Sequence, residues 1–282
     1  MKKHFNKKMS FSLVICILLS VAMLAFMQGC AKSGSASNEF RVGMECGYAP
    51  FNWTQTDNSN GAVEIERSGT FAGGYDVEIA KRIAEGLGLK LVIVKTDWEG
   101  LLPAITSGKI DAIVAGMSPT DERKETIDFS DNYYESDLVI VVRKDGPYVY
   151  AKSLADLSGA KITGQLNTFH YGVIEQIPNV DQQTAMEDFP TMIAAVTSGK
   201  IDGYVSERPG AKSAELSNPN LTYVSFDSAN GFQCSPDDTA IAIGLKKDSQ
   251  YTAKINEILK GISAADQEAI MDAAFNNQPA SE

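Results

Sequence analysis

Residues 104–114 read AITSGKIDAIV, and residues 195–205 repeat this segment as AVTSGKIDGYV. Eight of the eleven positions are identical across an offset of 91 residues. Each copy is typical of a helix end, a Gly-Lys turn and a buried strand. Two copies are too few for a solenoid, whose repeats stack in larger numbers. The repeat therefore predicts two similar α/β lobes of about 100 residues each.

Polar residues follow both copied strands. Ser118-Pro-Thr-Asp-Glu-Arg123 comes after the first copy, and Ser206-Glu-Arg208 comes after the second. Ligands of open α/β sheets bind at the carboxyl ends of the strands. Two lobes that present these ends to each other predict a ligand-binding cleft between them.

The segments around the first copy alternate between strand and helix patterns. We expect strands at residues 40–44, 90–94 and 110–115, and helices at residues 76–87 and 98–107. Residues 54–69 are polar and carry an Asn-Ser-Asn-Gly turn signal, so we expect a surface excursion there. The alternation predicts an α/β fold with a parallel or mixed sheet in each lobe.

Composition excludes several classes of protein. The chain has 282 residues, of which 44% are hydrophobic and 22% charged, so it is neither disordered, nor collagen-like, nor a polytopic membrane protein. The net charge of −11 argues against nucleic acid as a partner, because phosphate binding needs Lys and Arg. Two His and four Cys, without a CxxC or HxxxH pair, predict no metal site.

The first thirty residues have the pattern of a secretory signal. Four lysines precede an apolar run at residues 10–26, and Gly29-Cys30 and a Ser/Gly-rich stretch follow. This end resembles a bacterial lipobox, which implies that residues 1–29 are removed and that Cys30 carries the lipid. We then expect residues 30–39 to be a tether and the protein to be extracytoplasmic and lipid-anchored to the membrane. The alternative is an uncleaved anchor helix with an incidental Cys.

Cys46 and Cys234 remain in the folded part of the chain. Outside the cytoplasm two such thiols can form a disulfide. The sequence does not show whether they are close in space, so both states stay open.

Two charged residues after the copied strands suit a zwitterion. Thr120 followed by two acids predicts a helix start, with Arg123 in its first turn. A guanidinium beside free helix amides is a good carboxylate receptor. Glu207 is the matching anion on the other lobe and suits an ammonium group. The alternatives are a solvated surface Arg123 and an ion pair between Glu207 and Arg208.

Aromatic residues gather near the predicted cleft. Tyr48 follows the first strand, and Trp98 follows the strand at residues 90–94. Two rings from two loops can enclose a ligand side chain by stacking or by cation–π contact. We expect Phe51 and Trp53 to belong to the core instead.

With these residues in place, the chain resembles the family 3 solute-binding proteins of bacterial ABC transporters for amino acids. The resemblance covers about residues 40–275 and rests on four segments: YAPF, GGYDVEIAKRIAEGLG, DWEGLLPAITSGKIDAIVAGMSPTDERKETIDFSDNYY and SGKIDGYVSERP. It implies a type II periplasmic-binding-protein fold of two α/β lobes joined by two hinge crossings, near residues 132–137 and 235–239. Lobe 1 would comprise residues 40–134 and 238–282, and lobe 2 residues 135–237. It further implies a monomer whose partners are a free L-amino acid, an ABC permease and its ATPase, with no cofactor, no catalytic residue and no nucleic acid.

The resemblance also assigns ligand contacts. It implies that Arg123 binds the ligand carboxylate with help from Ser118 and the backbone of Gly116 and Met117, and that Thr168 adds a contact from lobe 2. Glu207 would hold the ammonium, where the family usually has Asp. Tyr48 and Trp98 match the aromatic walls, and Glu45 and Gln165 match positions that face the ligand side chain. The chain departs from the family at Asn167, where Gly is usual before the Thr.

Glu45 indicates the ligand class. A carboxylate beside aromatic rings favours a cationic side chain, such as that of arginine or lysine. A bulky neutral amino acid is the alternative, because Trp98 and Phe169 can widen an apolar pocket. His170 is expected to support the lobe 2 loop. Two other functions stay open: a dehydratase acting on a small cyclic acid, for which Glu45 and Glu207 are the candidate acid and base, and a sensor accessory that uses the same cleft.

Overall fold

The computed structural model describes residues 38–279. The signal expected at residues 1–29, the lipidation expected at Cys30 and most of the expected tether lie outside the described residues. Within the described part of the chain, no helix has the length and apolar character that crossing a bilayer requires.

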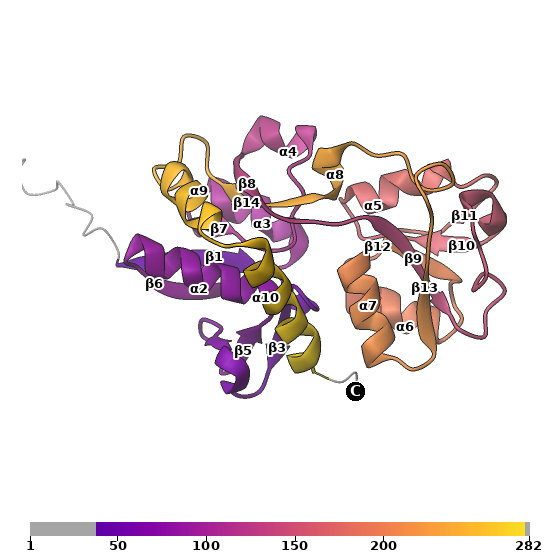
Figure 1. The fold of residues 1–282 in the computed structure, drawn as a ribbon, viewed down its shortest axis with the longest axis horizontal. Coiled ribbons are helices and arrows are strands. Elements are labelled where there is room, and N and C mark those ends of the chain that lie inside the picture. Colours follow the sequence, from indigo (N-terminus) through magenta and orange to yellow (C-terminus); the bar gives the residue numbers. More distant parts are fainter. Residues whose placement is uncertain (1–37, 280–282) are drawn as a thin grey trace, which may run out of the picture. The chain divides into compact units, whose positions relative to one another are not determined.

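The first sheet combines both ends of the described chain. Its strand order is β6 (Lys90–Lys95), β1 (Glu39–Met44), β7 (Ala112–Ile113), β14 (Ala240–Leu245) and β8 (Asp128–Glu135). β1 pairs in parallel with β6 and β7, whereas β14 runs antiparallel to β7 and β8. The sheet and its helices form lobe 1, drawn in indigo to magenta and in yellow in Figure 1. These helices are α2 (Tyr75–Leu87), α3 (Trp98–Thr106), α4 (Asp121–Thr126), α9 (Thr252–Lys260) and α10 (Ala264–Asn277).

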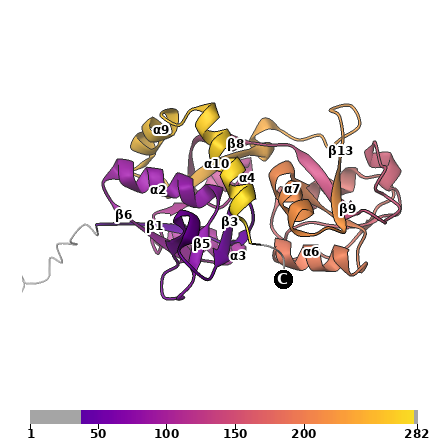
Figure 2. The ribbon, with the colours of Figure 1, turned by 60° about the horizontal axis from the view of Figure 1, so that its bottom comes forward.

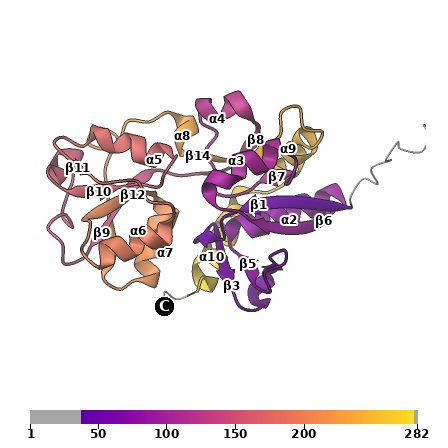
Figure 3. The same ribbon diagram turned by 180° about the vertical axis from the view of Figure 1, so that it is seen from behind.

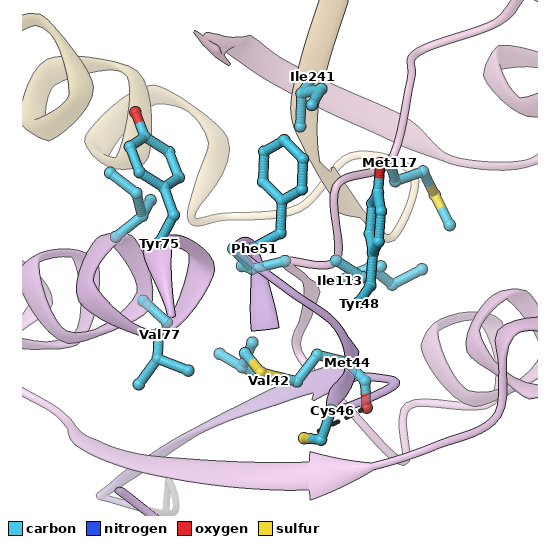
Figure 4. Close-up of a cluster of buried hydrophobic side chains, with 14 of the residues drawn as sticks. Val42, Met44, Cys46, Tyr48, Phe51, Tyr75, Val77, Ile113, Met117 and Ile241 are labelled. Atoms are coloured by element: carbon cyan, nitrogen blue, oxygen red, sulfur yellow. Dashed lines mark hydrogen bonds between the residues drawn. The ribbon is translucent and has the colours of Figure 1, made fainter. Parts of the chain in front are cut away.

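Alternation along β1 places helices on both faces of this sheet. A Cβ atom on Gly43 would lie 3.1 Å from Leu101 of α3, so this position faces α3. Val42 and Met44 point the other way and belong with Val77 of α2 to one buried cluster (Figure 4). A parallel sheet needs both faces covered, because both are apolar. Figure 2 shows α2, α9 and α10 on one side of the sheet.

The second sheet forms lobe 2. Its order is β11 (Asp181–Gln182), β10 (Lys161–Thr163), β12 (Gly203–Glu207), β9 (Leu138–Arg143) and β13 (Leu221–Ser225). β10 is parallel to β11 and β12, and β9 is antiparallel to β12 and β13. Its helices, seen from behind in Figure 3, are α5 (Phe169–Gly172), α6 (Phe189–Thr197) and α7 (Arg208–Ser217), with the short 3₁₀ helices η2 (Leu154–Leu157) and η3 (Val173–Gln176).

The sequence repeat is also a structural repeat. Gly108 and Gly199 end α3 and α6 with φ values of 76° and 72°, a left-handed conformation that favours Gly. Asp111 accepts from the amide of Arg41 on β1 at 2.8 Å, and Asp202 accepts from the amide of Lys161 on β10 at 2.9 Å. In each copy the Asp side chain therefore accepts a hydrogen bond from the neighbouring parallel strand in the same way. The prediction of two related α/β lobes is confirmed.

The elements expected around the first copy are present, with two differences. Residues 54–69 lie in the expected excursion, a small antiparallel sheet of order β2 (Gly47–Tyr48), β3 (Asn52–Gln55), β5 (Phe71–Gly73) and β4 (Val63–Glu64), with η1 (Ser59–Gly61). The strand expected at residues 110–115 pairs only over Ala112–Ile113. Beyond it the amide of Val114 still donates to the Gly43 carbonyl at 3.2 Å, and the chain turns at Gly116, whose φ is 61°. The excursion is also not wholly solvent-exposed, since Ile65 is buried.

The chain passes between the sheets twice. It leaves the first sheet between β8 and β9 and returns between β13 and β14 through α8 (Pro236–Thr239). The two crossings run beside each other, because the amide of Ser136 donates to the carbonyl of Thr239 at 3.1 Å. Two lobes joined by two such crossings form the type II periplasmic-binding-protein architecture.

Aromatic rings fill the core behind the loop that follows β1. Phe51 lies between Tyr75 and Tyr48, with ring centroids 6.2 Å and 5.0 Å away (Figure 4). Phe51 is fully buried and Trp53 nearly so, which confirms both as core residues. Cys46 is buried and Cys234 is exposed, and both are free thiols, so the structure does not contain the disulfide that the sequence left open.

Candidate functional site

A cavity lies between the two lobes. Lobe 1 lines it from the loop after β1, from the start of α3, from the loop after β7 and from α4; lobe 2 lines it from the ends of β10 and β12 and from α5 and α6. The lining residues are Tyr48, Trp98, Ala115, Gly116, Ser118, Arg123, Gln165, Thr168, Phe169, His170, Phe189 and Glu207. Nine of the eleven residues expected to bind the ligand are among them. Met117 and Glu45 are not.

Arg123 enters this cavity from α4. Thr120 caps the helix by accepting from the Arg123 amide at 3.4 Å, as the sequence predicted. The Arg123 guanidinium is buried. It donates to the Ser118 carbonyl at 2.9 Å and to the Asn167 carbonyl at 3.4 Å. It also lies 4.9 Å from the ring centre of Trp98. Burial lowers the pKa of Arg123 to about 10. The side chain is therefore a buried cation at neutral pH, and the alternative of a solvated surface Arg is wrong.

The loop after β7 is fixed by contacts with Tyr48 and with the residues around β14. Gly116 has φ 61°, and a Cβ atom there would lie 2.9 Å from the Tyr48 ring. The Ser118 hydroxyl donates to the carbonyl of Asp238 at 2.9 Å, and the Met117 carbonyl accepts from the amide of Ala242 at 3.0 Å. Met117 therefore supports the loop through its backbone, while its side chain lies outside the cavity lining.

A buried polar network supports both lobe 1 loops, and sequence analysis missed it. Asp76 of α2 is fully buried and accepts from the Tyr133 hydroxyl at 2.7 Å and from the Asn52 amide group at 2.8 Å. Asn52 in turn accepts from the Cys46 amide at 2.8 Å, and Tyr133 accepts from the Gly116 amide at 3.4 Å. Burial raises the pKa of Asp76 to about 6 despite these hydrogen bonds. The network fixes the loops that carry Tyr48 and Ser118 relative to α2.

Glu207 ends β12 and is almost wholly buried. Its Oε1 lies 2.8 Å from Nε2 of His170, and its Oε2 accepts from the Tyr48 hydroxyl. Burial by itself would raise the pKa of Glu207, but His170 and Tyr48 outweigh it and hold this pKa below its usual range. Arg208 pairs instead with Asp137, its Nε donating to Oδ1 at 2.7 Å. The expected alternative of a Glu207–Arg208 pair is therefore wrong.

Tyr48 connects the lobes. It projects from β2 of lobe 1, is almost fully buried, and stacks on Phe189 of lobe 2 with ring centres 4.0 Å apart. A Cβ atom on Gly210 of α7 would lie 2.9 Å from its ring, so the ring touches lobe 2 on a second side. Tyr48 and Trp98 both line the cavity, as expected, whereas Phe189 carried no recognisable signal in the sequence.

Glu45 lies beside the cavity rather than in its lining. Gln165 of lobe 2 donates to its Oε1 at 2.9 Å and also to the Glu187 carbonyl at 3.0 Å. Burial raises the pKa of Glu45 to about 8; the Gln165 hydrogen bond lowers it, and the charges of Asp188 and Asp97 raise it further. With these two acids Glu45 lines a neighbouring pocket that opens beside Trp98.

The backbone conformation at position 167 explains why Asn can stand where the family usually has Gly. Asn167 has φ 56°, a conformation that Asn tolerates better than other non-Gly residues. Its carbonyl accepts from the Trp98 indole at 3.3 Å as well as from Arg123. Thr168 begins α5 and donates to the Gln165 carbonyl at 2.7 Å. Asn167 therefore keeps the backbone turn that Gly would form, and Phe169 and His170 of the following α5 line the cavity.

The chain matches a known protein family over nearly all its described residues. The model of bacterial extracellular solute-binding proteins, family 3, matches residues 40–277. A probable histidine-binding protein of Campylobacter jejuni subsp. jejuni is 32% identical over 217 residues, which is 74% of this chain and 78% of that protein. The arginine-binding extracellular protein ArtP of Bacillus subtilis is 28% identical over 251 residues, covering 86% and 90% of the two chains.

A solved structure has the same fold. The crystal structure of an amino acid ABC transporter substrate-binding protein from Streptococcus pneumoniae, bound to L-arginine, aligns with a TM-score of 0.73 at 26% identity, over 85% of this chain and 94% of that one. The match of family model, relatives and architecture covers nearly all the described residues. The chain belongs to the bacterial extracellular solute-binding proteins of family 3.

Proposed function

We propose that this protein binds a free L-amino acid in the cavity between its lobes and delivers it to an ABC permease and its ATPase. The observation that carries the proposal is the pair of buried, opposite charges that line one cavity from different lobes, Arg123 from lobe 1 and Glu207 from lobe 2. A free amino acid presents a carboxylate and an ammonium to match them. Only a ligand that touches both lobes stabilises closure.

The proposed contacts follow the geometry of the described residues. Arg123 would hold the carboxylate with help from Ser118 and the backbone near Gly116, and Thr168 would contribute from lobe 2. Glu207 would hold the ammonium. Tyr48, Trp98, Phe169 and Phe189 would enclose the side chain, and Gln165 and Glu45 would meet its far end. No residue in this set is proposed to act as a catalyst.

We propose a cationic side chain for the ligand, with arginine or lysine favoured. Glu45, Asp97 and Asp188 line the neighbouring pocket together with Trp98, which also lines the cavity. Three carboxyl groups and an aromatic ring suit a cation. Relatives described as arginine- and histidine-binding support this class.

The remaining parts of the proposal concern the chain as a whole. We propose that lobe 1 comprises residues 40–134 and 238–282 and lobe 2 residues 135–237, so that the hinges lie where the crossings run side by side. We propose that the monomeric protein is tethered outside the cell by a lipid on Cys30.

A thermal-shift screen tests the function. The purified mature domain is heated with each of the twenty amino acids, ornithine and citrulline, because a ligand that binds only the folded state raises its melting temperature. Arginine or lysine is expected to give the largest shift, and isothermal titration should give one site per chain. A screen in which no amino acid raises the melting temperature would refute the proposal. Turnover of prephenate-like acids, followed by product formation, would support the dehydratase alternative instead.

A further inference from the structure

The end of the C-terminal helix reaches from lobe 1 to lobe 2. α10 lies beside α2 in lobe 1, where its residues Ile270, Met271 and Ala274 are buried (Figure 2). Gln278 is the C-cap of α10, and its amide donates to the carbonyl of Ala274 at 3.0 Å. The side chain of Gln278 then contacts α7 of lobe 2. We call residues 275–279 the C-terminal strap.

Gln278 makes three hydrogen bonds to α7. Its Oε1 accepts from the hydroxyl of Ser213 at 2.5 Å, and its Nε2 donates to the hydroxyl of Ser217 at 3.2 Å and to the carbonyl of Ser213 at 3.4 Å. Ser213 is only 3% exposed, so its hydroxyl has little access to water. The hydrogen bond between Ser213 and Gln278 therefore contributes more than one on the open surface does.

The strap contacts α7 a second time through Phe275. The Nζ atom of Lys212 lies 4.1 Å from the ring centre of Phe275, which is a cation–π distance. At the other end of the strap, Pro279 lines the pocket beside the cavity together with Glu45 and Asp188. The strap thus joins the lobes at a place other than the two crossings, and separation of the lobes about the crossings would break its contacts.

α7 connects the strap to the proposed ligand site. Glu207 is the N-cap of α7, and a Cβ atom on Gly210 of this helix would lie 2.9 Å from the ring of Tyr48. None of residues 275–279 is among the residues that line the cavity. Contacts that fix α7 relative to lobe 1 therefore also fix Glu207 relative to Arg123, without touching a ligand.

We propose that Gln278 is a positioning residue that raises the affinity for the amino acid from outside the cavity, by holding α7 and Glu207 against lobe 1. This inference rests on the proposed function and adds a control of affinity to it. A contact made only when the lobes are together raises the population of the arrangement in which both lobes touch the ligand. Release of the ligand requires the lobes to separate, so the same contact slows dissociation.

The first test compares Gln278→Ala with Asn277→Ala. Asn277 is the matched control, because it ends α10, is exposed and makes no side-chain hydrogen bond to a described residue. Gln278→Ala should weaken the binding of L-arginine by about two- to tenfold, the range that such hydrogen bonds provide, and Asn277→Ala should leave it unchanged. If arginine does not bind, the probe is the amino acid that raises the melting temperature most.

Stopped-flow fluorescence of Trp98, which lines the cavity, separates the two rate constants. In Gln278→Ala the dissociation rate constant should rise by the same factor as the dissociation constant, with little change in the association rate constant. A merely structural role would lower the melting temperature and leave both rate constants as they are. A dissociation rate constant equal to that of the unmodified protein would overturn the inference.

Two further measurements show whether Gln278 acts through α7. The ratio of the dissociation constants of two amino acids should be the same in Gln278→Ala as in the unmodified protein, because the strap does not touch the ligand. Adding Ser213→Ala to Gln278→Ala should weaken binding no further, because the hydroxyl of Ser213 has then already lost its partner. A changed ratio or fully additive losses would overturn the inference.

The outcomes separate this inference from the proposed function. Failure of every amino acid to bind the unmodified protein would overturn the function itself. The role of Gln278 is then judged by small-angle X-ray scattering, which needs no ligand. Gln278→Ala should have a larger radius of gyration than Asn277→Ala, and in that case equal radii would overturn the inference as well.

Discussion

The ring of Tyr48 in lobe 1 stacks on the ring of Phe189 in lobe 2, with centroids 4.0 Å apart and planes inclined by 9°. The same side chain donates to Glu207 from its hydroxyl. Tyr48 therefore stabilises contact between the lobes twice, by ring packing and by a charge-assisted hydrogen bond. A residue expected to form only one wall of the ligand site thus also joins the lobes.

Tyr48→Ala should shift the ligand-free protein towards an open arrangement of the lobes, because it removes both contacts. Small-angle X-ray scattering should give a larger radius of gyration than for the unmodified protein. Tyr48→Phe is the matched control, since it keeps the stacking and loses only the hydroxyl. Its radius of gyration should lie between those of the unmodified protein and Tyr48→Ala. Identical radii for all three proteins would contradict this role.

Arg123→Ala should weaken amino acid binding by at least about tenfold, because hydrogen bonds from a charged donor contribute about 1.5–3 kcal/mol. The melting temperature without ligand should change little. Arg41→Ala is the control: Arg41 is also an arginine of lobe 1, but it pairs with Glu66 away from the cavity, and its loss should leave the dissociation constant unchanged. Titration calorimetry measures both, and equal affinities for the two variants would refute the assignment of Arg123.

Glu45 should make the binding of cationic amino acids depend on pH. Its raised pKa of about 8 means that the carboxyl group is mostly protonated at pH 7. A cation needs the ionised form, so arginine affinity should rise between pH 7 and pH 8, by at most about tenfold per unit. A neutral amino acid does not need the charge and should show no rise over this interval.

Glu45→Gln provides the check on specificity. It should remove the rise between pH 7 and pH 8 and weaken arginine binding more than the binding of a neutral amino acid. Equal losses for both ligand classes, measured by calorimetry, would refute the cationic ligand.

Gly74→Ala should destabilise the fold severely. Gly74 precedes α2 at φ 123°, and a Cβ atom there would lie 2.3 Å from the carbonyl oxygen of Phe51. We expect a loss of at least about 3 kcal/mol in the free energy of unfolding. Gly88→Ala at the other end of the same helix is the control: its φ of 68° is also strained, but nothing lies within 4 Å, so about 1 kcal/mol is expected. Urea denaturation that ranks the two variants the other way would contradict this account.

Local patterns determined much of this structure. The helical stripe at residues 76–87 became α2, and Thr120 and its acids placed Arg123 in the first turn of α4. The repeated segment determined two related lobes, because each copy contains its own helix end, left-handed Gly and strand. These features depend on contacts between residues that are near in sequence or on one neighbouring strand, so periodicity and turn chemistry suffice to predict them.

The contacts across the cavity were decided by tertiary structure alone. Tyr48 and Glu207 are 159 residues apart, and Glu45 and Gln165 are 120 apart. Sequence placed His170 beside the lobe 2 loop, but only the approach of α5 to the end of β12 puts its ring against Glu207. Phe189, Asn52 and Asp76 are ordinary residues in the sequence, and their importance comes from what surrounds them. The physical reason is that burial and partners set the charge and orientation of a polar side chain, and both depend on how distant segments pack.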